Sequence, residues 1–215
     1  MIQKFRFNTI SNNLANINTN AFKKDIISFN EMLTMKYVSG TDFTPGPVKY
    51  TGNELDVALE TKGFFKIQTP KGIRYTREGA FKINDDGKLA TQNGDIVLGQ
   101  NGSIPISGNE VSINNNGQVI MEDNLVDTIL VVDFAQTQLL KKEGSSYYIY
   151  QGKENDIYTP ENINLQQKYL EGSNVSPTKE MIKMVEAFRA FESSQKAIQC
   201  IDEITRKMIN DAGQI

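Results

Sequence analysis

The sequence of 215 residues contains no histidine. Histidine is the side chain that proteins use most often as a general acid or base near neutral pH, and it is a leading metal ligand. Catalytic triads, zinc sites and most metal-dependent hydrolases are therefore excluded, and only carboxylate, lysine, tyrosine or cysteine chemistry remains. The composition argues against an enzyme, and we expect no cofactor and no metal site.

Cysteine is almost absent as well. The one cysteine, Cys200, excludes a disulfide within the chain. It lies beside the apolar stripe of a predicted C-terminal helix, so its expected role is buried packing.

Long apolar runs and an excess of positive charge are also missing. No run reaches the eighteen apolar residues that a transmembrane helix needs. The formal net charge of -3 offers no basic surface to nucleic acid and no polybasic membrane anchor. Residues 1–6 lack the apolar core and cleavage site of a secretory signal. We expect a globular protein that binds no nucleic acid, inserts in no membrane and has no cleaved signal peptide.

The longest feature is an amphipathic helix predicted over residues 176–210. A Ser-Pro pair at its start favours helix initiation, and apolar residues follow at three- and four-residue steps. At 1.5 Å per residue the helix would be roughly 50 Å long, against about 30 Å for a small domain. Part of its apolar stripe therefore needs cover from another molecule, which indicates assembly. The predicted interface residues are Met181, Met184, Val185, Phe188, Phe191, Ile198, Ile201, Ile204 and Met208.

Charged residues on the other side of this helix are spaced for ion pairs. Acidic residues precede basic residues by four positions, which is the favourable order on a helix. The two predicted pairs are Glu192 with Lys196, and Glu203 with Lys207.

The N-terminal region, to about Tyr37, is also predicted to be helical. Apolar residues lie at helical steps, but asparagine is unusually frequent among them, and asparagine competes for backbone hydrogen bonds. Either the segment is rich in turns, or the amides make hydrogen bonds between helices inside an assembly. The apolar interface candidates are Ile10, Leu14 and Ile17, with Phe29, Met32 and Leu33 continuing the pattern; the asparagine candidates are Asn12, Asn13, Asn16 and Asn18.

The middle of the chain, from Tyr50 to about Tyr150, has the pattern of an antiparallel sheet. Short β-rich runs alternate with turn signals at roughly ten-residue spacing. Several turns contain Asn-Gly or Asp-Gly, which tolerate positive φ. Residues 129–134 form an apolar run that is predicted to be a buried strand, residues 147–150 the last strand, and residues 151–170 a polar linker.

The predicted fold class is therefore α+β. An all-β antiparallel central domain is flanked by N- and C-terminal helices, which are expected to pair in a coiled-coil-like terminal domain. The expected division is residues 1–38 for the N-terminal half of that domain, 39–155 for the β domain, and 156–215 for a linker and the long helix.

Two hypotheses from other classes remain. A carboxylate-based hydrolase with a helical oligomerisation arm would need a pair of acidic residues, although no spacing favours one; candidates are Glu54, Asp56, Glu60 and Glu78. An autonomous coiled-coil binding module would form a small stable oligomer and no filament. Residues 85–88, Asp-Asp-Gly-Lys, superficially suggest a calcium loop, but the further ligands are missing and a hairpin turn explains them.

Three sets of motifs closely resemble those of bacterial flagellar rod and hook proteins. Residues 11–23, SNNLANINTNAFK, are similar to the family's N-terminal signature, roughly S-N-N-L-A-N-x-N-T-x-G-F-K, with Ala21 in place of the usual glycine. The family usually has a further helical turn or more before this motif. The central motifs include Tyr50-Thr51-Gly52, Gly63-Phe64-Phe65 and Tyr75-Thr76-Arg77-Glu78-Gly79, and the C-terminal signature includes Leu170-Glu171-Gly172-Ser173-Asn174-Val175.

The resemblance implies a structural subunit of the flagellar basal-body rod. Copies would stack helically, with one another and with other axial rod and hook proteins, into the drive shaft that transmits torque across the periplasm. Export would use the flagellar type III apparatus, unfolded and without a cleaved signal peptide. Thr44-Pro45-Gly46 shortly before Tyr50-Thr51-Gly52 favours the proximal rod, and a distal-rod or hook-like subunit is the alternative.

Overall fold

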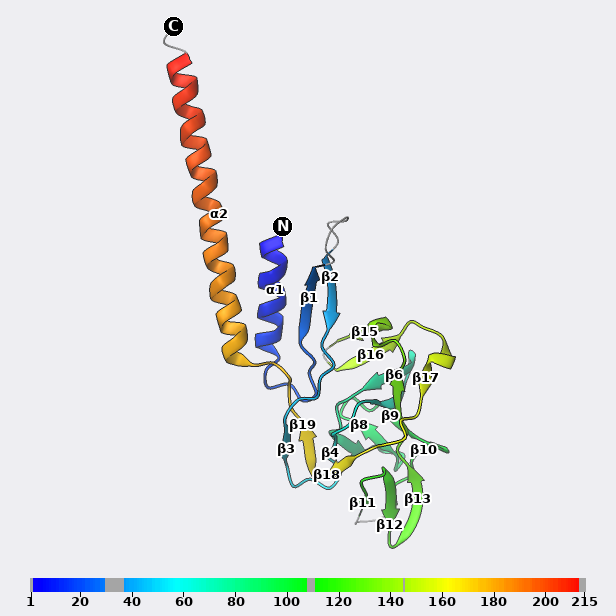
Figure 1. Cartoon of the computed structure of the whole chain (residues 1–215). Helices are drawn as coiled ribbons and strands as arrows, with labels where there is room; N and C mark the ends of the chain where they lie inside the picture. Colours follow the sequence, from blue (N-terminus) through cyan, green and yellow to red (C-terminus); the bar gives the residue numbers. More distant parts are fainter. Residues whose placement is uncertain (1, 30–36, 108–110, 145, 213–215) are drawn as a thin grey trace.

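The computed structural model describes residues 2–29, 37–107, 111–144 and 146–212. A β-rich body occupies one end of the molecule, and two helices and a β-hairpin project from it (Figure 1). The long helix α2, Pro177–Ala212, extends far beyond the shorter helix α1, Ile2–Ala15. The predicted C-terminal helix is confirmed to within two residues at its end.

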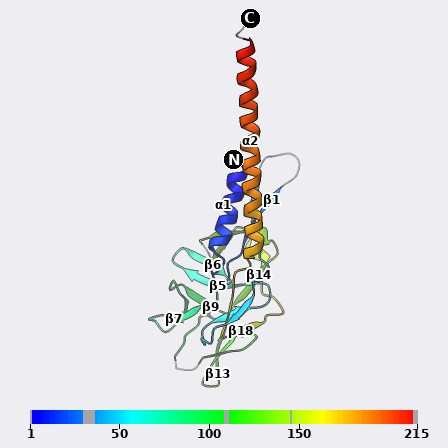
Figure 2. The same ribbon diagram turned by 90° about the vertical axis from the view of Figure 1, so that its left-hand side faces the viewer.

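Helix α1 packs between α2 and a hairpin formed by β1, Asp25–Phe29, and β2, Tyr37–Thr41 (Figures 1 and 2). The rings of Phe7 and Phe188 meet edge to face at 5.2 Å. The Asn13 amide lies 3.4 Å from a carboxylate oxygen of Glu180. These two contacts show that α1 and α2 run antiparallel.

The prediction of helix to about Tyr37 is wrong, because α1 ends at Ala15 and the hairpin follows. The Asn16 side chain donates to the carbonyl of Asn12 at 2.9 Å, and residues 16–21 form turns that end at Ala21 with φ 52°. Asparagine thus ends the helix by local hydrogen bonding. Phe29 lies on β1, whereas Met32 and Leu33 lie outside the described residues.

The largest sheet of the body is antiparallel, and its main strand order is β15-β16-β6-β5-β9-β8-β7, with β10, β14 and β17 joined to it. Its strands are β5, Phe64–Thr69; β6, Gly72–Thr76; β7, Phe81–Ile83; β8, Leu89–Thr91; β9, Ile96–Gly99; β10, Gly102–Ser103; β14, Val131–Phe134; β15, Leu140–Glu143; β16, Tyr147–Tyr150; and β17, Ile157–Tyr158.

Smaller sheets complete the body. Strands β11, Ser112–Ile113, β12, Gln118–Met121, and β13, Asn124–Thr128, form one of them. Strand β4, Val57–Leu59, pairs with β18, Leu165–Gln167, and β3, Val48–Tyr50, pairs with β19, Tyr169–Glu171. Two short 3-10 helices, Thr137–Leu139 and Glu154–Asp156, lie in connections.

The predicted turns and the buried central strand are confirmed. The Asn84 side chain accepts the N–H groups of Asp86 and Lys88, and Gly87 has φ 71°. A hairpin turn and not a calcium loop therefore occupies residues 84–88. All four residues of β14 are buried, as the apolar run from residue 129 predicted.

The prediction of a polar linker over residues 151–170 is wrong. Strands β17 and β18 lie within it, and β19 begins there. These strands are two or three residues long, too short to show a period-2 pattern, and the partners of β18 and β19 lie more than 100 residues earlier in the chain. The division into 1–38, 39–155 and 156–215 stays a prediction.

The core of the body consists of two packed clusters. The larger is centred on fully buried side chains such as Phe65, Ile67 and Val97, and the smaller is aromatic, with Phe64, Phe134 and Tyr148. An antiparallel β centre with a helix at each end is thus observed, and the α+β class is confirmed.

Candidate assembly interface

Helix α2 is covered by the rest of the chain over its first turns only. Glu180 and Ala187 are buried, and Met184 and Ala190 are half-buried. From Phe191 to Ile209 every side chain is exposed. Because a helix rises 1.5 Å per residue, roughly 28 Å of α2 has no cover from the described chain.

The predicted apolar stripe follows this division. Met184 is half-buried, whereas the other eight predicted residues of α2 are 48% to 68% exposed. The prediction missed two further exposed residues, Ile182 and Ile209. An apolar surface of this length is unusual on an isolated protein, which makes it the candidate interaction site.

The exposed residues lie on two sides of α2. Ile198 follows the buried Ala187 by eleven residues, about three turns, so it continues the side that packs on α1. We call this continuation the distal face; it consists of Phe191, Ile198, Ile201, Met208 and Ile209. A second patch, Met181, Val185 and Phe188, lies beside the α1 contact nearer the body.

The predicted N-terminal residues serve partly within the chain. Ile10 is buried, Leu14, Asn16 and Ile17 are half-buried, and Asn12 and Asn18 are exposed. The buried Asn13 amide exchanges hydrogen bonds of 2.8 and 2.9 Å with the backbone of Asp25, in addition to its contact with Glu180. Asn13 therefore joins α1, β1 and α2 of one subunit.

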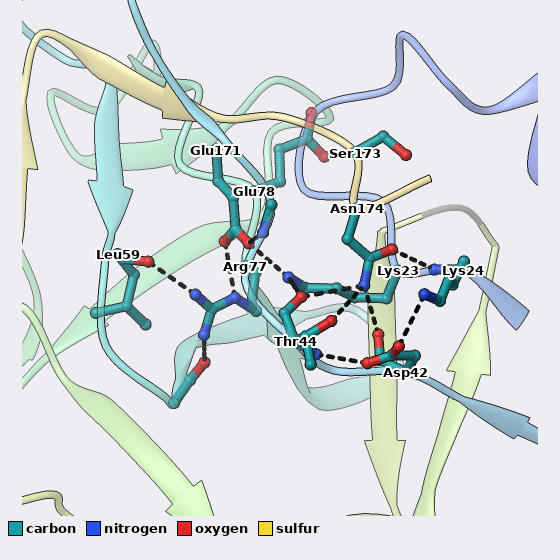
Figure 3. Close-up of polar contacts among 12 residues, drawn as sticks. Lys23, Lys24, Asp42, Thr44, Leu59, Arg77, Glu78, Glu171, Ser173 and Asn174 are labelled. Carbon is teal, nitrogen blue, oxygen red and sulfur yellow. Dashed lines mark hydrogen bonds and ion pairs between the residues drawn. The ribbon is translucent and has the colours of Figure 1, made fainter. Parts of the chain in front are cut away.

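Three charged residues form a buried cluster where the helices meet the body (Figure 3). Lys23 follows α1, Arg77 follows β6, and Glu171 ends β19. Lys23 Nζ lies 2.5 Å from one Glu171 carboxylate oxygen, and Arg77 Nε lies 2.7 Å from the other. Their side chains are at most 1% exposed. We call Lys23, Arg77 and Glu171 the root cluster.

Further hydrogen bonds satisfy the root cluster. The Arg77 guanidinium also donates to the carbonyls of Leu59, Thr61 and Gly63 at 2.7 to 3.0 Å. The Gly46 N–H donates to Glu171 at 2.7 Å. A Cβ at Gly46 would lie 2.1 Å from the Gly172 carbonyl oxygen, so only glycine can bring this N–H so close.

The root cluster contains two cations and one anion, and it is closed to water. Burial, and then the positive charge of Arg77, lower the pKa of Lys23 from 10.5 to about 8, against the opposing effect of Glu171. Lys23 also donates to the carbonyl of Thr44 at 2.8 Å.

Asn174 fastens the connection to α2 beside the root cluster (Figure 3). Its side-chain oxygen accepts the Lys24 N–H at 2.8 Å, and its amide donates to the carbonyls of Asp42 and Thr44 at 2.8 and 3.0 Å. Lys24 and Asp42 form an ion pair at 3.0 Å. The segments that lead to both helices are thus held to each other and to the body.

Sequence reasoning missed the root cluster, although its signal was present. Lys23 ends the N-terminal signature, Arg77 lies in the central Tyr-Thr-Arg-Glu-Gly motif, and Glu171 lies in the C-terminal signature. Each motif contains one of the three charged residues, and the pairs that they form join residues 94 and 148 positions apart in the sequence. Only the fold shows that these three charges belong together.

Two predictions on α2 are wrong. Cys200 is exposed and not buried, because it lies in the part of α2 from Phe191 to Ile209 where every side chain is exposed. No ion pair joins Glu192 to Lys196 or Glu203 to Lys207 in the described chain, where the one ion pair within α2 is Glu180 with Lys183. Long exposed side chains gain little from such pairs in water.

Three of the four acidic residues considered for hydrolysis have separate structural partners. Asp56 accepts a hydrogen bond from Asn53, Glu60 accepts from Asn164 and Gln166, and Glu54 lies 3.9 Å from Lys168. In the described part of the chain, neither helix has the length and apolarity to span a bilayer.

Two family models match the chain. The family model described as "Flagellar basal body rod FlgEFG protein C-terminal" matches residues 166–211, which include β19 and most of α2. The family model described as "Flagellar hook protein FlgE/F/G D1 domain" matches residues 58–121 of the β body.

Similar proteins extend these matches to nearly the whole chain. The flagellar basal-body rod protein FlgF of Caulobacter vibrioides is 32% identical over 225 aligned positions, covering 96% of this chain and 91% of the relative. FlgG of Buchnera aphidicola subsp. Schizaphis graminum is 29% identical over 243 positions, covering 96% and 94%. FlgG of Bacillus subtilis is 31% identical over 244 positions, covering 95% and 92%.

A covered β body joined to a long, uncovered apolar helix defines a structural protein that is built for assembly. Its motifs and its relatives make the class specific. The chain belongs to the family of flagellar basal-body rod proteins. It is a structural rod subunit and not an enzyme, and nothing supports the hydrolase hypothesis.

Proposed function

We propose that this chain assembles helically into the axial drive shaft of the flagellum, with α1 and α2 as the contacts between copies. The observation that carries the proposal is the uncovered distal face of α2. Fully burying an apolar side chain of this size contributes about 1.5–3 kcal/mol, so several such residues supply a large driving force for association.

The terminal helices pair in a coiled-coil-like way in this proposal. The antiparallel contacts of Phe7 with Phe188 and of Asn13 with Glu180 support it. Sister copies would continue this packing along the distal face. The interface comprises the predicted α2 residues together with Ile182 and Ile209, and Leu14, Ile17, Asn12, Asn16 and Asn18 from the N-terminal segment; Ile10 and Asn13 act within the subunit.

A proximal position in the rod is the finer proposal. Thr44-Pro45-Gly46 shortly before Tyr50-Thr51-Gly52 supports it through the resemblance to the proximal-rod pattern. The chain also aligns with the FlgF relative over 225 positions, against 243 and 244 for the two FlgG relatives, so it needs fewer gaps to match FlgF. A distal-rod or hook-like position is the second candidate. Labelling the subunit in isolated basal bodies and locating it relative to the outer rings separates the two.

We further propose that the chain leaves the cell through the flagellar type III export apparatus, without signal cleavage, and reaches a rod that spans the periplasm. An uncovered α2 is consistent with terminal helices that order only on assembly. Hydrogen exchange on the free subunit tests this: the distal half of α2 should exchange within seconds, and protection equal to that of the β body would contradict it.

The test of assembly is the Ile201→Asp substitution. Ile201 is 62% exposed on the distal face, so a carboxylate there leaves the β body folded but prevents burial between copies. We expect loss of incorporation into basal bodies and loss of swimming. Gln199→Asp is the matched control, since it places the same residue on the opposite side of the same turn and should swim normally. Normal swimming of Ile201→Asp would overturn the proposal.

A further inference from the structure

The surface that receives the distal face can be sought on the subunit itself. A rod grows through head-to-tail contacts, in which the donor and acceptor surfaces differ. Two distal faces packed on each other would form a two-fold contact that closes at a dimer. The acceptor is therefore a different surface of the same chain.

A groove of about 910 Å³ lies on the flank of α1. Helix α1, the β1–β2 hairpin and residues 137–142 at the edge of the body form its walls. Its apolar lining includes Phe5, Ile26, Phe43 and Leu139. This volume is in the upper range of sites that hold an apolar ligand, and a groove beside a helix is the kind of surface that receives an amphipathic helix.

Polar groups of the groove match those of the distal half of α2. Asn8 and Asn12 line the groove, are exposed, and make no side-chain hydrogen bond with any described residue. Lys141 is exposed at the groove and has no ion pair within the described ranges. On α2, Asp202 follows Ile198 by one turn on the same side and is likewise exposed, with no ion pair to another described residue.

The distal face also resembles the part of α2 that packs on α1 within the subunit. It continues the side of α2 that packs on α1 within the subunit, through Glu180, Met184 and Ala187. The distal half projects roughly 28 Å beyond its own cover, so it can reach another subunit without distortion of either body.

We propose that the groove between α1, the β1–β2 hairpin and the body receives the distal half of α2 from a second copy of this chain. Each α1 is then held between two α2 helices, its own and a neighbour's. The inference rests on the proposed function and names the acceptor that the proposed assembly requires.

Disulfide trapping in basal bodies tests the contact. Asn12→Cys is combined with Ile198→Cys or with Ile201→Cys, in each case with Cys200→Ser. Within one subunit Asn12 lies near the level of Glu180, roughly 25 Å along α2 from Ile198, and a disulfide needs Cα atoms within about 7 Å. Any disulfide is thus between copies. We expect oxidation to give a ladder of linked subunits on a non-reducing gel.

The control is Asn12→Cys with the native Cys200, which lies on the side of α2 opposite Phe191 and should give no ladder. Absence of a ladder from both engineered pairs in rods that contain the variants would overturn the inference. A disulfide-linked dimer of the Ile201→Cys variant without the Asn12→Cys substitution would also overturn the inference, since such a dimer shows two distal faces in contact. Both outcomes leave the proposed function intact, because the variant subunits are still found in the rod. Normal swimming of Ile201→Asp, in contrast, would overturn the proposed function and this inference together.

A charge in the groove provides a second readout. Asn12→Arg fills the groove and should reduce incorporation by roughly tenfold or more, the effect of losing one central contact of an interface. Asn116→Arg makes the same change at an exposed asparagine in a turn of the β body, outside the groove and outside the proposed interface, and should incorporate normally. Equal incorporation of the two variants, with unchanged unfolding of the β body in both, would contradict the inference.

Discussion

The β body and the terminal helices use similar apolar residues in opposite ways. In the body, Phe65, Ile67 and Val97 are fully buried, whereas on α2 Phe191, Ile198 and Ile201 are about half exposed or more. The body completes its core within one chain. The helices leave their apolar residues uncovered, and in the proposed assembly other molecules cover them, so that stability belongs to one region and assembly to the other.

The sharpest test of this comparison is the same truncation in each region. Phe65→Ala removes a fully buried ring that packs on Phe81 at 5.3 Å and should lower the free energy of unfolding by about 3–5 kcal/mol. Phe191→Ala should change it by less than about 0.5 kcal/mol in the free subunit yet impair assembly. Urea denaturation and basal-body incorporation measure the two effects, and equal losses of stability would contradict the division.

The root cluster joins the two regions, and disrupting it should lower the free energy of unfolding about as much as Phe65→Ala does. Glu171→Ala leaves Lys23 and Arg77 buried without a counter-charge, which should cost about 3–5 kcal/mol of unfolding free energy. Glu54→Ala is the control, since Glu54 and Lys168 are 49% and 42% exposed and such pairs contribute about 1 kcal/mol or less. If both variants unfold at the same urea concentration, the root cluster does not hold the fold.

The pKa of Lys23 predicts a dependence of stability on pH. With a pKa of about 8 in the folded chain and 10.5 unfolded, Lys23 binds fewer protons when folded between these values. Stability should therefore rise between about pH 8 and pH 10, by up to about 3 kcal/mol, and not change below pH 8 through this group. Above pH 10, buried tyrosines such as Tyr148, whose pKa is raised by burial, act in the opposite direction.

Lys23→Met is the matched variant for this measurement. It keeps a long side chain but cannot titrate, so the rise in stability between pH 8 and pH 10 should disappear. A rise of the same size in Lys23→Met would assign the effect to other groups.

The smallest expected effect concerns the turn after α1. Ala21 has φ 52°, a left-handed conformation that costs a residue with a Cβ about 1–2 kcal/mol. Glycine relieves this strain but loses a buried methyl group, worth about 0.8 kcal/mol, and gains freedom in the unfolded chain. We expect Ala21→Gly to change the unfolding free energy by less than about 1 kcal/mol in either direction, measured by urea denaturation. A loss above 2 kcal/mol would contradict this account.

Sequence patterns predicted the features that depend on neighbouring residues. The long helix, the Asn-Gly and Asp-Gly turns and the buried strand β14 follow from local periodicity and turn chemistry. The hairpin β1–β2 was missed because a helical spacing of apolar residues was extended through asparagines that end the helix. Strands β18 and β19 were missed because their pairing partners are remote and their length is only three residues.

For the candidate interface too, the sequence predicted the part that depends on local spacing and missed the part that depends on contacts between distant segments. The exposed residues of α2 were named from their spacing, since a helix longer than its domain cannot be covered. The internal role of Asn13 was not foreseen, because its hydrogen bonds go to β1 of a hairpin that the sequence pattern did not show. The pairing of Lys23, Arg77 and Glu171 depends on three-dimensional proximity alone.

The root cluster also determines how stiff the subunit is under load. A twist applied to the helices reaches the body through the backbone connections after β2 and before α2, and these are braced by the hydrogen bonds of Lys23 and Asn174 to the carbonyl of Thr44. Lys142 of the body adds a further link to the hairpin through its ion pair with Asp25. Such bonds act in parallel, so none can yield alone. A shaft made of such subunits would flex between neighbouring copies sooner than at the neck of each one.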